Sequence, residues 1–62
     1  MKNYKLYNVG DEVIITFSHG DDKGKIGKIV EVRHSFCKIQ IDGYKKPVNH
    51  TYGQFKLYSN EN

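Results

Sequence analysis

The 62-residue chain lacks tryptophan and alanine altogether, and it has one cysteine, Cys37, one proline, Pro47, and one arginine, Arg33. A single cysteine excludes an internal disulfide and a zinc site built from several thiolates. Its alternating apolar surroundings favour a small buried or half-buried side chain over a reactive thiol. The basic residues are nine lysines and one arginine, so Arg33 is the one basic residue suited to bidentate contact with a base, which disfavours sequence-specific reading of DNA.

The sequence also lacks a long apolar run. No stretch approaches the roughly 18 residues of a membrane helix, and the first residues lack the continuous apolar region of a signal peptide. We therefore expect a soluble, cytoplasmic protein. The abundance of Lys, Asn, Ile and Tyr is typical of AT-rich codons and hints at a low-GC bacterium or one of its phages.

The length allows one domain, spanning residues 1–62, with loosely ordered ends at about 1–5 and 59–62. Hydrophobic residues make up 37% and charged residues 27%, which is unlike the composition of disordered chains. A chain this short buries roughly 60% of the surface that it exposes when unfolded. Its core must therefore be one small cluster.

Short runs rich in Val, Ile, Tyr and Phe recur between turn signals, and no window repeats its apolar residues at helical spacing. This pattern predicts an all-β protein with strands at residues 12–17, 28–33, 36–41, 44–49 and 56–58. Asp42 and Gly43 form a strong hairpin signal of type I′, and Pro47 moves the return strand at residues 44–49 toward an edge. Five short strands favour a small closed or nearly closed antiparallel barrel.

Two groups of apolar residues are expected in the barrel core. Ile26, Ile29 and Val32 are spaced three apart, so a bulge or sharp bend near Gly27 is needed to bring them to one side. The second group continues the apolar alternation of the first and last strands and consists of Phe17, Phe55 and Leu57. Another three residues, Tyr4, Leu6 and Tyr7, are expected to cover the open end of the barrel.

The segment from Gly10 to Gly43, about half of the chain, resembles the KOW motif of ribosomal proteins and of transcription elongation factors of the bacterial antitermination type. The matching residues are Gly10, Asp11, Gly20, Lys23, Gly24, Gly27, Ile29 and Val32, followed by a hydrophobic-acid-glycine hairpin at residues 39–43. The stretch before Gly20 is two residues longer than the usual pattern. The resemblance implies a five-stranded SH3-like barrel, whose basic loops in that family often contact RNA or a partner protein.

The Gly- and Lys-rich segment at residues 20–28 fits neither of two ligand-binding loops. Gly20 and Gly24 are one residue too close for a phosphate-binding P-loop, and Ile26 stands where a metal-binding Ser or Thr would follow the lysine. Lysines also occupy positions where an EF-hand needs oxygen ligands. The glycines are interpreted as a strand-bending device, and the lysines as either a solvated face or a phosphate-contacting surface.

No catalytic or metal-binding set is expected. The three histidines, at positions 19, 34 and 50, lie beside turns without the spacing of zinc ligands. His19, Asp21 and Asp22 are interpreted as solvated loop residues. Ser18 beside His19, and His34 beside Ser35, lack an orienting acid. We therefore expect a non-enzymatic protein without a cofactor.

Charge distribution suggests a function. The net charge is +3, and between Lys23 and Lys46 seven basic residues stand against two acidic ones. The leading hypothesis is a small binding module that contacts RNA or a ribonucleoprotein or transcription complex, with weak sequence specificity. Phe36 and two tyrosines could stack on bases, although packing is the alternative for each. The predicted contact residues are Lys23, Lys25, Lys28, Arg33, Lys45, Lys46, Tyr44 and Tyr52.

A protein-interaction barrel is the alternative, for instance a phage or mobile-element accessory that docks on a host protein or associates with itself. The modest charge supports it, as does an acidic patch expected from Asp11, Glu12, Asp21 and Asp22 that would repel nucleic acid. SH3-like barrels bind proteins as readily as RNA, so the fold cannot decide between the two. Basic residues gathered beside exposed aromatic rings would favour RNA, and scattered basic residues beside an exposed apolar patch would favour protein.

Overall fold

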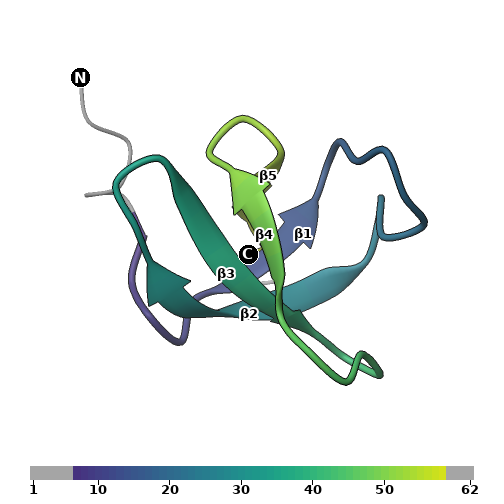
Figure 1. The fold of residues 1–62 in the computed structure, drawn as a ribbon, viewed down its shortest axis with the longest axis horizontal. Coiled ribbons are helices and arrows are strands. Elements are labelled where there is room, and N and C mark those ends of the chain that lie inside the picture. Colours follow the sequence, from purple (N-terminus) through teal and green to yellow (C-terminus); the bar gives the residue numbers. More distant parts are fainter. Residues whose placement is uncertain (1–6, 59–62) are drawn as a thin grey trace.

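The computed structural model describes residues 7–58, and all regular structure in this range is β (Figure 1). Five strands form one antiparallel sheet in the order β4-β3-β2-β1-β5. They are β1 (Glu12–Ile15), β2 (Ile26–Val32), β3 (Phe36–Ile41), β4 (Val48–Thr51) and β5 (Phe55–Leu57). No helix long or apolar enough to cross a membrane occurs in this part of the chain.

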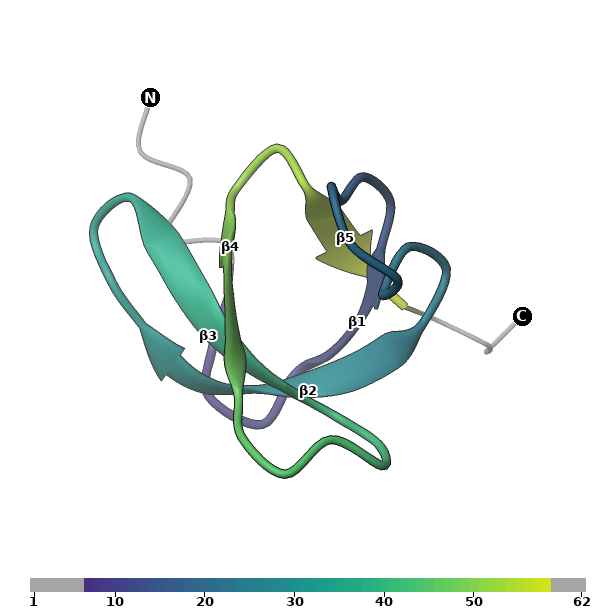
Figure 2. The same ribbon diagram turned by 45° about the vertical axis from the view of Figure 1, so that its right-hand side comes forward.

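The sheet curls around a common centre, as Figure 2 shows, but it does not close. The all-β prediction is confirmed. β4 and β5 are the two edges of the sheet, so the return strand is at an edge as expected, but it begins at Val48, after Pro47, and not at Tyr44. The barrel is open rather than sealed by strand pairing. Tyr4, Leu6 and the expected loose ends lie outside the described residues, whereas Tyr7 packs against the core.

The core contains seven residues that are at most 3% exposed: Val13, Ile15, Ile29, Cys37, Ile39, Ile41 and Phe55. β3 supplies three of them because its inward residues alternate with outward ones, as the sequence pattern predicted. Cys37 is fully buried, in agreement with the interpretation of a packed thiol. Burial raises the pKa of this thiol, while a hydrogen bond with Tyr52 acts in the opposite direction.

The bulge lies at Val30 and not near Gly27. Ile29 pairs with Ile39, whereas Glu31 pairs with Lys38, so Val30 is the extra residue on β2. Ile26 precedes the bulge and points to the outer face of the sheet, which corrects the expectation that it joins Ile29 in the core. Val32 follows the bulge and packs against the core as expected.

Gly27 has a different role from the bend predicted for it. A Cβ at this position would lie 2.7 Å from the backbone oxygen of Gln40 and 2.7 Å from Cγ2 of Ile39. Glycine is therefore required because β2 and β3 approach closely here. The positive φ angles belong to Gly10, Gly24 and Gly43, each of which lies in a turn.

Two other expectations are wrong in detail. β1 ends at Ile15, so Phe17 lies beyond the strand and is 50% exposed, and Leu57 on the edge strand β5 is also 50% exposed. The turn at Asp42 and Gly43 is not of type I′, because Gly43 alone has a positive φ there. The chain continues as a loop to Pro47 before β4 begins.

Candidate binding surface

The basic residues predicted as contacts fall into three places on the sheet. Gly27 pairs with Ile41, so the loops that precede β2 and follow β3 leave the same end of the sheet. The first loop carries Lys23 and Lys25, and the second carries Lys45 and Lys46; all four side chains are exposed. This end of the sheet, defined by these four lysines, is called the lysine end below.

Arg33 is not at the lysine end. It follows β2, whose seven residues span about 20 Å, so it lies at the opposite end of the sheet. Its Nη1 is 2.5 Å from Oε2 of Glu31. This hydrogen bond lowers the pKa of Glu31, and the charges of Arg33 and Lys38 act in the same direction. The positive charge of Arg33 is thus offset locally.

The two tyrosines predicted to stack on bases are engaged in the fold. Tyr44 is half-buried and packs against the core. Tyr52 stacks on Tyr7 with ring centroids 5.7 Å apart, and its hydroxyl donates a 2.5 Å hydrogen bond to the carbonyl oxygen of Arg33. Both tyrosines are thus partly buried and packed in the fold. Phe36 shares the outer face with Lys38, as the alternation predicted, and is half-buried.

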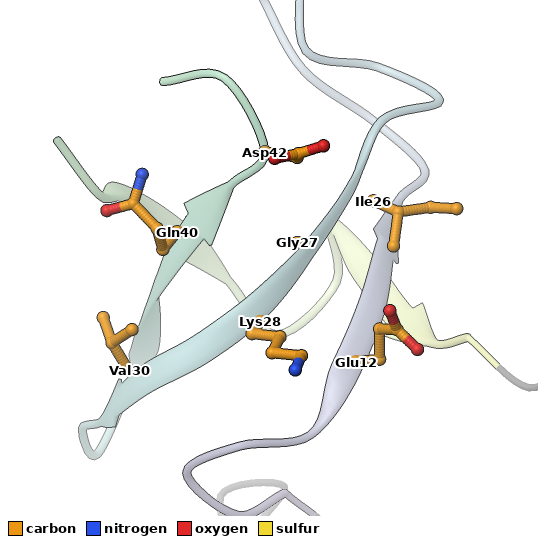
Figure 3. Close-up of a pocket in the computed structure, with 7 residues that line it drawn as sticks. All are labelled: Glu12, Ile26, Gly27, Lys28, Val30, Gln40 and Asp42. Atoms are coloured by element: carbon orange, nitrogen blue, oxygen red, sulfur yellow. The ribbon is translucent and has the colours of Figure 1, made fainter. Parts of the chain in front are cut away.

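Lys28 lies on the outer face of the sheet, in a groove of about 480 Å³ (Figure 3). It is directly opposite Glu12 on β1, and Figure 3 shows its side chain extending from β2 toward β1. Ile26 and the 45% exposed Val30 give the groove an apolar part, and Asp42 adds a second carboxylate. Gln40 completes the lining while its amide nitrogen donates to the carbonyl of Tyr44. The groove thus has mixed charge.

A buried polar network joins the loop that carries Lys23 to the edge strand β4, and sequence reasoning missed it. His50 Nε2 lies 2.6 Å from Asp22 Oδ2, and the two side chains are only 7% and 9% exposed. The other ring nitrogen, Nδ1, is 3.0 Å from Oε1 of Gln54, which also accepts the backbone N–H of Thr51. An oxygen atom therefore lies within hydrogen-bond distance of each ring nitrogen of His50.

Asp22 is held ionised in this network. Its burial acts to raise the pKa, but hydrogen bonds from Ser18 and His50, a backbone hydrogen bond and the attraction to His50 together hold the pKa of Asp22 below its usual value. The interpretation of Asp22 as a solvated loop residue is wrong, and so is its place in an exposed acidic patch. Ser18 donates to Asp22 and not to His50, so these residues do not form a base-activated nucleophile.

Twenty-eight positions separate Asp22 from His50, and no local pattern announces such a pair. The sequence offered only an indirect signal for this pair. A polar side chain that faces the interior of a small β protein needs a hydrogen-bond partner. His50 is opposite the buried Cys37 on β3, so it faces inward. Within residues 7–58, no three His, Cys, Asp or Glu side chains gather as metal ligands.

Comparison of the sequence with models of known protein families and with curated proteins gives no match.

Proposed function

We propose that the protein is a small binding module that contacts RNA through its lysine end. The observation that carries this proposal is the pairing of Gly27 with Ile41, which brings the loops of Lys23 and Lys25 and of Lys45 and Lys46 to one end of the sheet. Four exposed ammonium groups attract phosphates, and the two exposed carboxylates on the same loops, Asp21 and Asp42, only partly offset them.

The buried pair of Asp22 and His50 supports the proposal in a second way. It removes one carboxylate from the solvent-facing charge of the loop, and it ties the loop of Lys23 and Lys25 to β4. A loop fixed in this way loses less conformational entropy when it binds. Lys28 is a weaker contributor, because Glu12 lies opposite it.

The test compares two variants of equal charge change. Lys23→Gln with Lys25→Gln removes two cations from the lysine end, and Lys38→Gln with Lys56→Gln removes two cations from the strands. Labelled single-stranded RNA is titrated at two salt concentrations. Binding that weakens steeply with salt, and weakens more in the first variant than in the second, supports the proposal. No binding by the wild-type protein at low salt, or equal losses in the two variants, rejects it.

A second candidate function, protein binding, is favoured by the groove on the outer face. Ile26 and Val30 give the groove apolar surface, and Glu12 and Asp42 add two carboxylates, which suits an extended peptide that carries a basic residue beside apolar ones. Val30→Asp should then abolish capture of a partner that survives nuclease treatment, and the Lys23 and Lys25 variant should leave it intact. The opposite result would place the partner at the lysine end.

A further inference from the structure

Phe17, which the sequence placed in the core, is instead an exposed aromatic ring at the start of the loop that carries Lys23 and Lys25. The residue is 50% exposed. Its backbone is nevertheless fixed: the N–H groups of Thr16 and Phe17 both donate to the carbonyl oxygen of Gln54, at 2.8 and 3.2 Å. Packing in the core therefore does not explain why an aromatic residue stands at this anchored position.

The ring of Phe17 contacts one neighbouring ring, and half of the residue's surface stays exposed. The ring of His19 stands at 79° to it, with ring centroids 5.2 Å apart. Downstream, Asp22 is bonded to His50, and the N–H of Gly24 donates to the carbonyl oxygen of Ile15 at 2.7 Å. The loop is thus closed at its base and braced in its middle, and it carries an exposed ring at one end and two exposed lysines further along.

We propose that Phe17 is a stacking platform for an unpaired base of single-stranded RNA, with Lys23 and Lys25 contacting the neighbouring phosphates. The inference rests on the function proposed above and adds a preference for single strands. An exposed ring beside cationic side chains is the recurring arrangement for holding unpaired bases, whereas the bases of a duplex are already stacked on each other. Tyr44 and Tyr52 are partly buried against the core, so each exposes a smaller fraction of its surface than Phe17 does.

The experiment measures binding of a single-stranded RNA that contains one 2-aminopurine and of a duplex with the same number of phosphates. Phe17→Ala should weaken single-strand binding about tenfold and abolish the change in 2-aminopurine fluorescence, while duplex binding stays unchanged. Phe17→Tyr keeps a ring and should behave as wild type. Val9→Ala, at an apolar residue that is 65% exposed in the turn before β1, is the matched control and should have no effect.

The outcomes separate the two proposals. If the Lys23 and Lys25 variant loses affinity for both RNAs while Phe17→Ala binds both as wild type does, stacking is rejected and the proposed function stands. If the wild-type protein binds neither RNA at low salt, both are rejected. Because Phe17 is exposed, the fold of Phe17→Ala should be intact, and its unfolding midpoint in urea verifies this.

Discussion

His50 on the edge strand β4 and Asp22 in the loop before β2 are joined by a 2.6 Å contact between Nε2 and Oδ2 in the interior of the protein. In the sheet, β4 and β5 are not paired with each other. The contact therefore connects two parts of the chain that no strand pairing connects. The N–H groups of Thr16 and Phe17, which donate to the carbonyl of Gln54, reinforce the connection on the same side.

Replacement of Asp22 by Asn should lower the free energy of unfolding at pH 7 by about 3 kcal/mol, because a buried pair that loses one partner leaves the other uncompensated. This is a large part of the roughly 3–9 kcal/mol expected for a chain of this length. Asp21→Asn removes the same charge from an exposed neighbour and should have little effect. Urea denaturation followed by circular dichroism measures both, and equal losses would contradict a role for burial.

The same pair predicts how stability depends on pH. The pKa of Asp22 is lower in the folded protein than its usual value, so the folded state favours the ionised form. Its contribution is complete above the unfolded pKa of about 4 and is lost as the pH falls through the lower folded pKa. The urea midpoint of the wild-type protein should fall steeply below about pH 4, and that of Asp22→Asn should fall less. Parallel curves for the two proteins would refute the prediction.

Gly27→Ala should destabilise the protein by about 1–3 kcal/mol, because the new methyl group would meet backbone and side-chain atoms at 2.7 Å. The control is Gly53→Ala, where a Cβ would meet no atom within 4 Å. Its effect should stay within about 0.5 kcal/mol. The urea midpoints of the two variants measure these effects. An unchanged midpoint for Gly27→Ala would show that β2 and β3 can move apart at little cost in free energy.

Cys37 should react with a thiol reagent only when the protein opens. The residue is 0% exposed, and burial raises the pKa of its thiol, so little thiolate is accessible in the folded state. Labelling should be slow at neutral pH and fast in about 6–8 M urea. In Asp22→Asn it should be faster by about tenfold for each 1.4 kcal/mol of lost stability, because it follows the population of the open form. Rapid labelling of the stable wild-type protein would mean that the core opens locally near β3.

If RNA binding is confirmed, the salt dependence of its binding constant should show how many lysines contact phosphates. For single strands, the logarithm of the binding constant falls with the logarithm of salt concentration by about 0.7 for each phosphate neutralised. Lys23→Gln with Lys25→Gln should therefore reduce the slope by about 1.4. Arg33→Gln should leave the slope unchanged, because Arg33 lies at the other end of the sheet and pairs with Glu31. An unchanged slope in the double variant would exclude these lysines as phosphate contacts.

The sequence was sufficient to predict a strand where the alternation of apolar residues and the turn signal agree. The bounds of β3 are those predicted, because Cys37, Ile39 and Ile41 alternate strictly up to the turn at Asp42. The prediction was wrong in β2, where the bulge reverses which residues face inward. The spacing of the apolar residues shows that a bulge is needed, but it does not show which residue forms it. Ile26 was consequently assigned to the wrong face of the sheet.

The candidate site was less predictable than the fold. Lys23, Lys25, Lys45 and Lys46 could be named from the charge pattern, but their common location follows from the register between β2 and β3. The alternation of Val13, Ile15 and Phe17 predicted that all three face inward, but β1 ends at Ile15. Where a strand stops depends on its partners, and those partners, Lys25 and Phe55, lie far along the chain from Ile15.

Val30 gives the sheet a position at which chain length can change. Elsewhere within a strand, loss of one residue would turn every following side chain to the opposite face. Loss of Val30 would leave Ile29, Glu31 and Val32 opposite Ile39, Lys38 and Cys37 in an unbroken ladder. Relatives of this protein that are one residue shorter in β2 can therefore keep the same interior, and an alignment that places the gap at Val30 would preserve every pairing of the two strands.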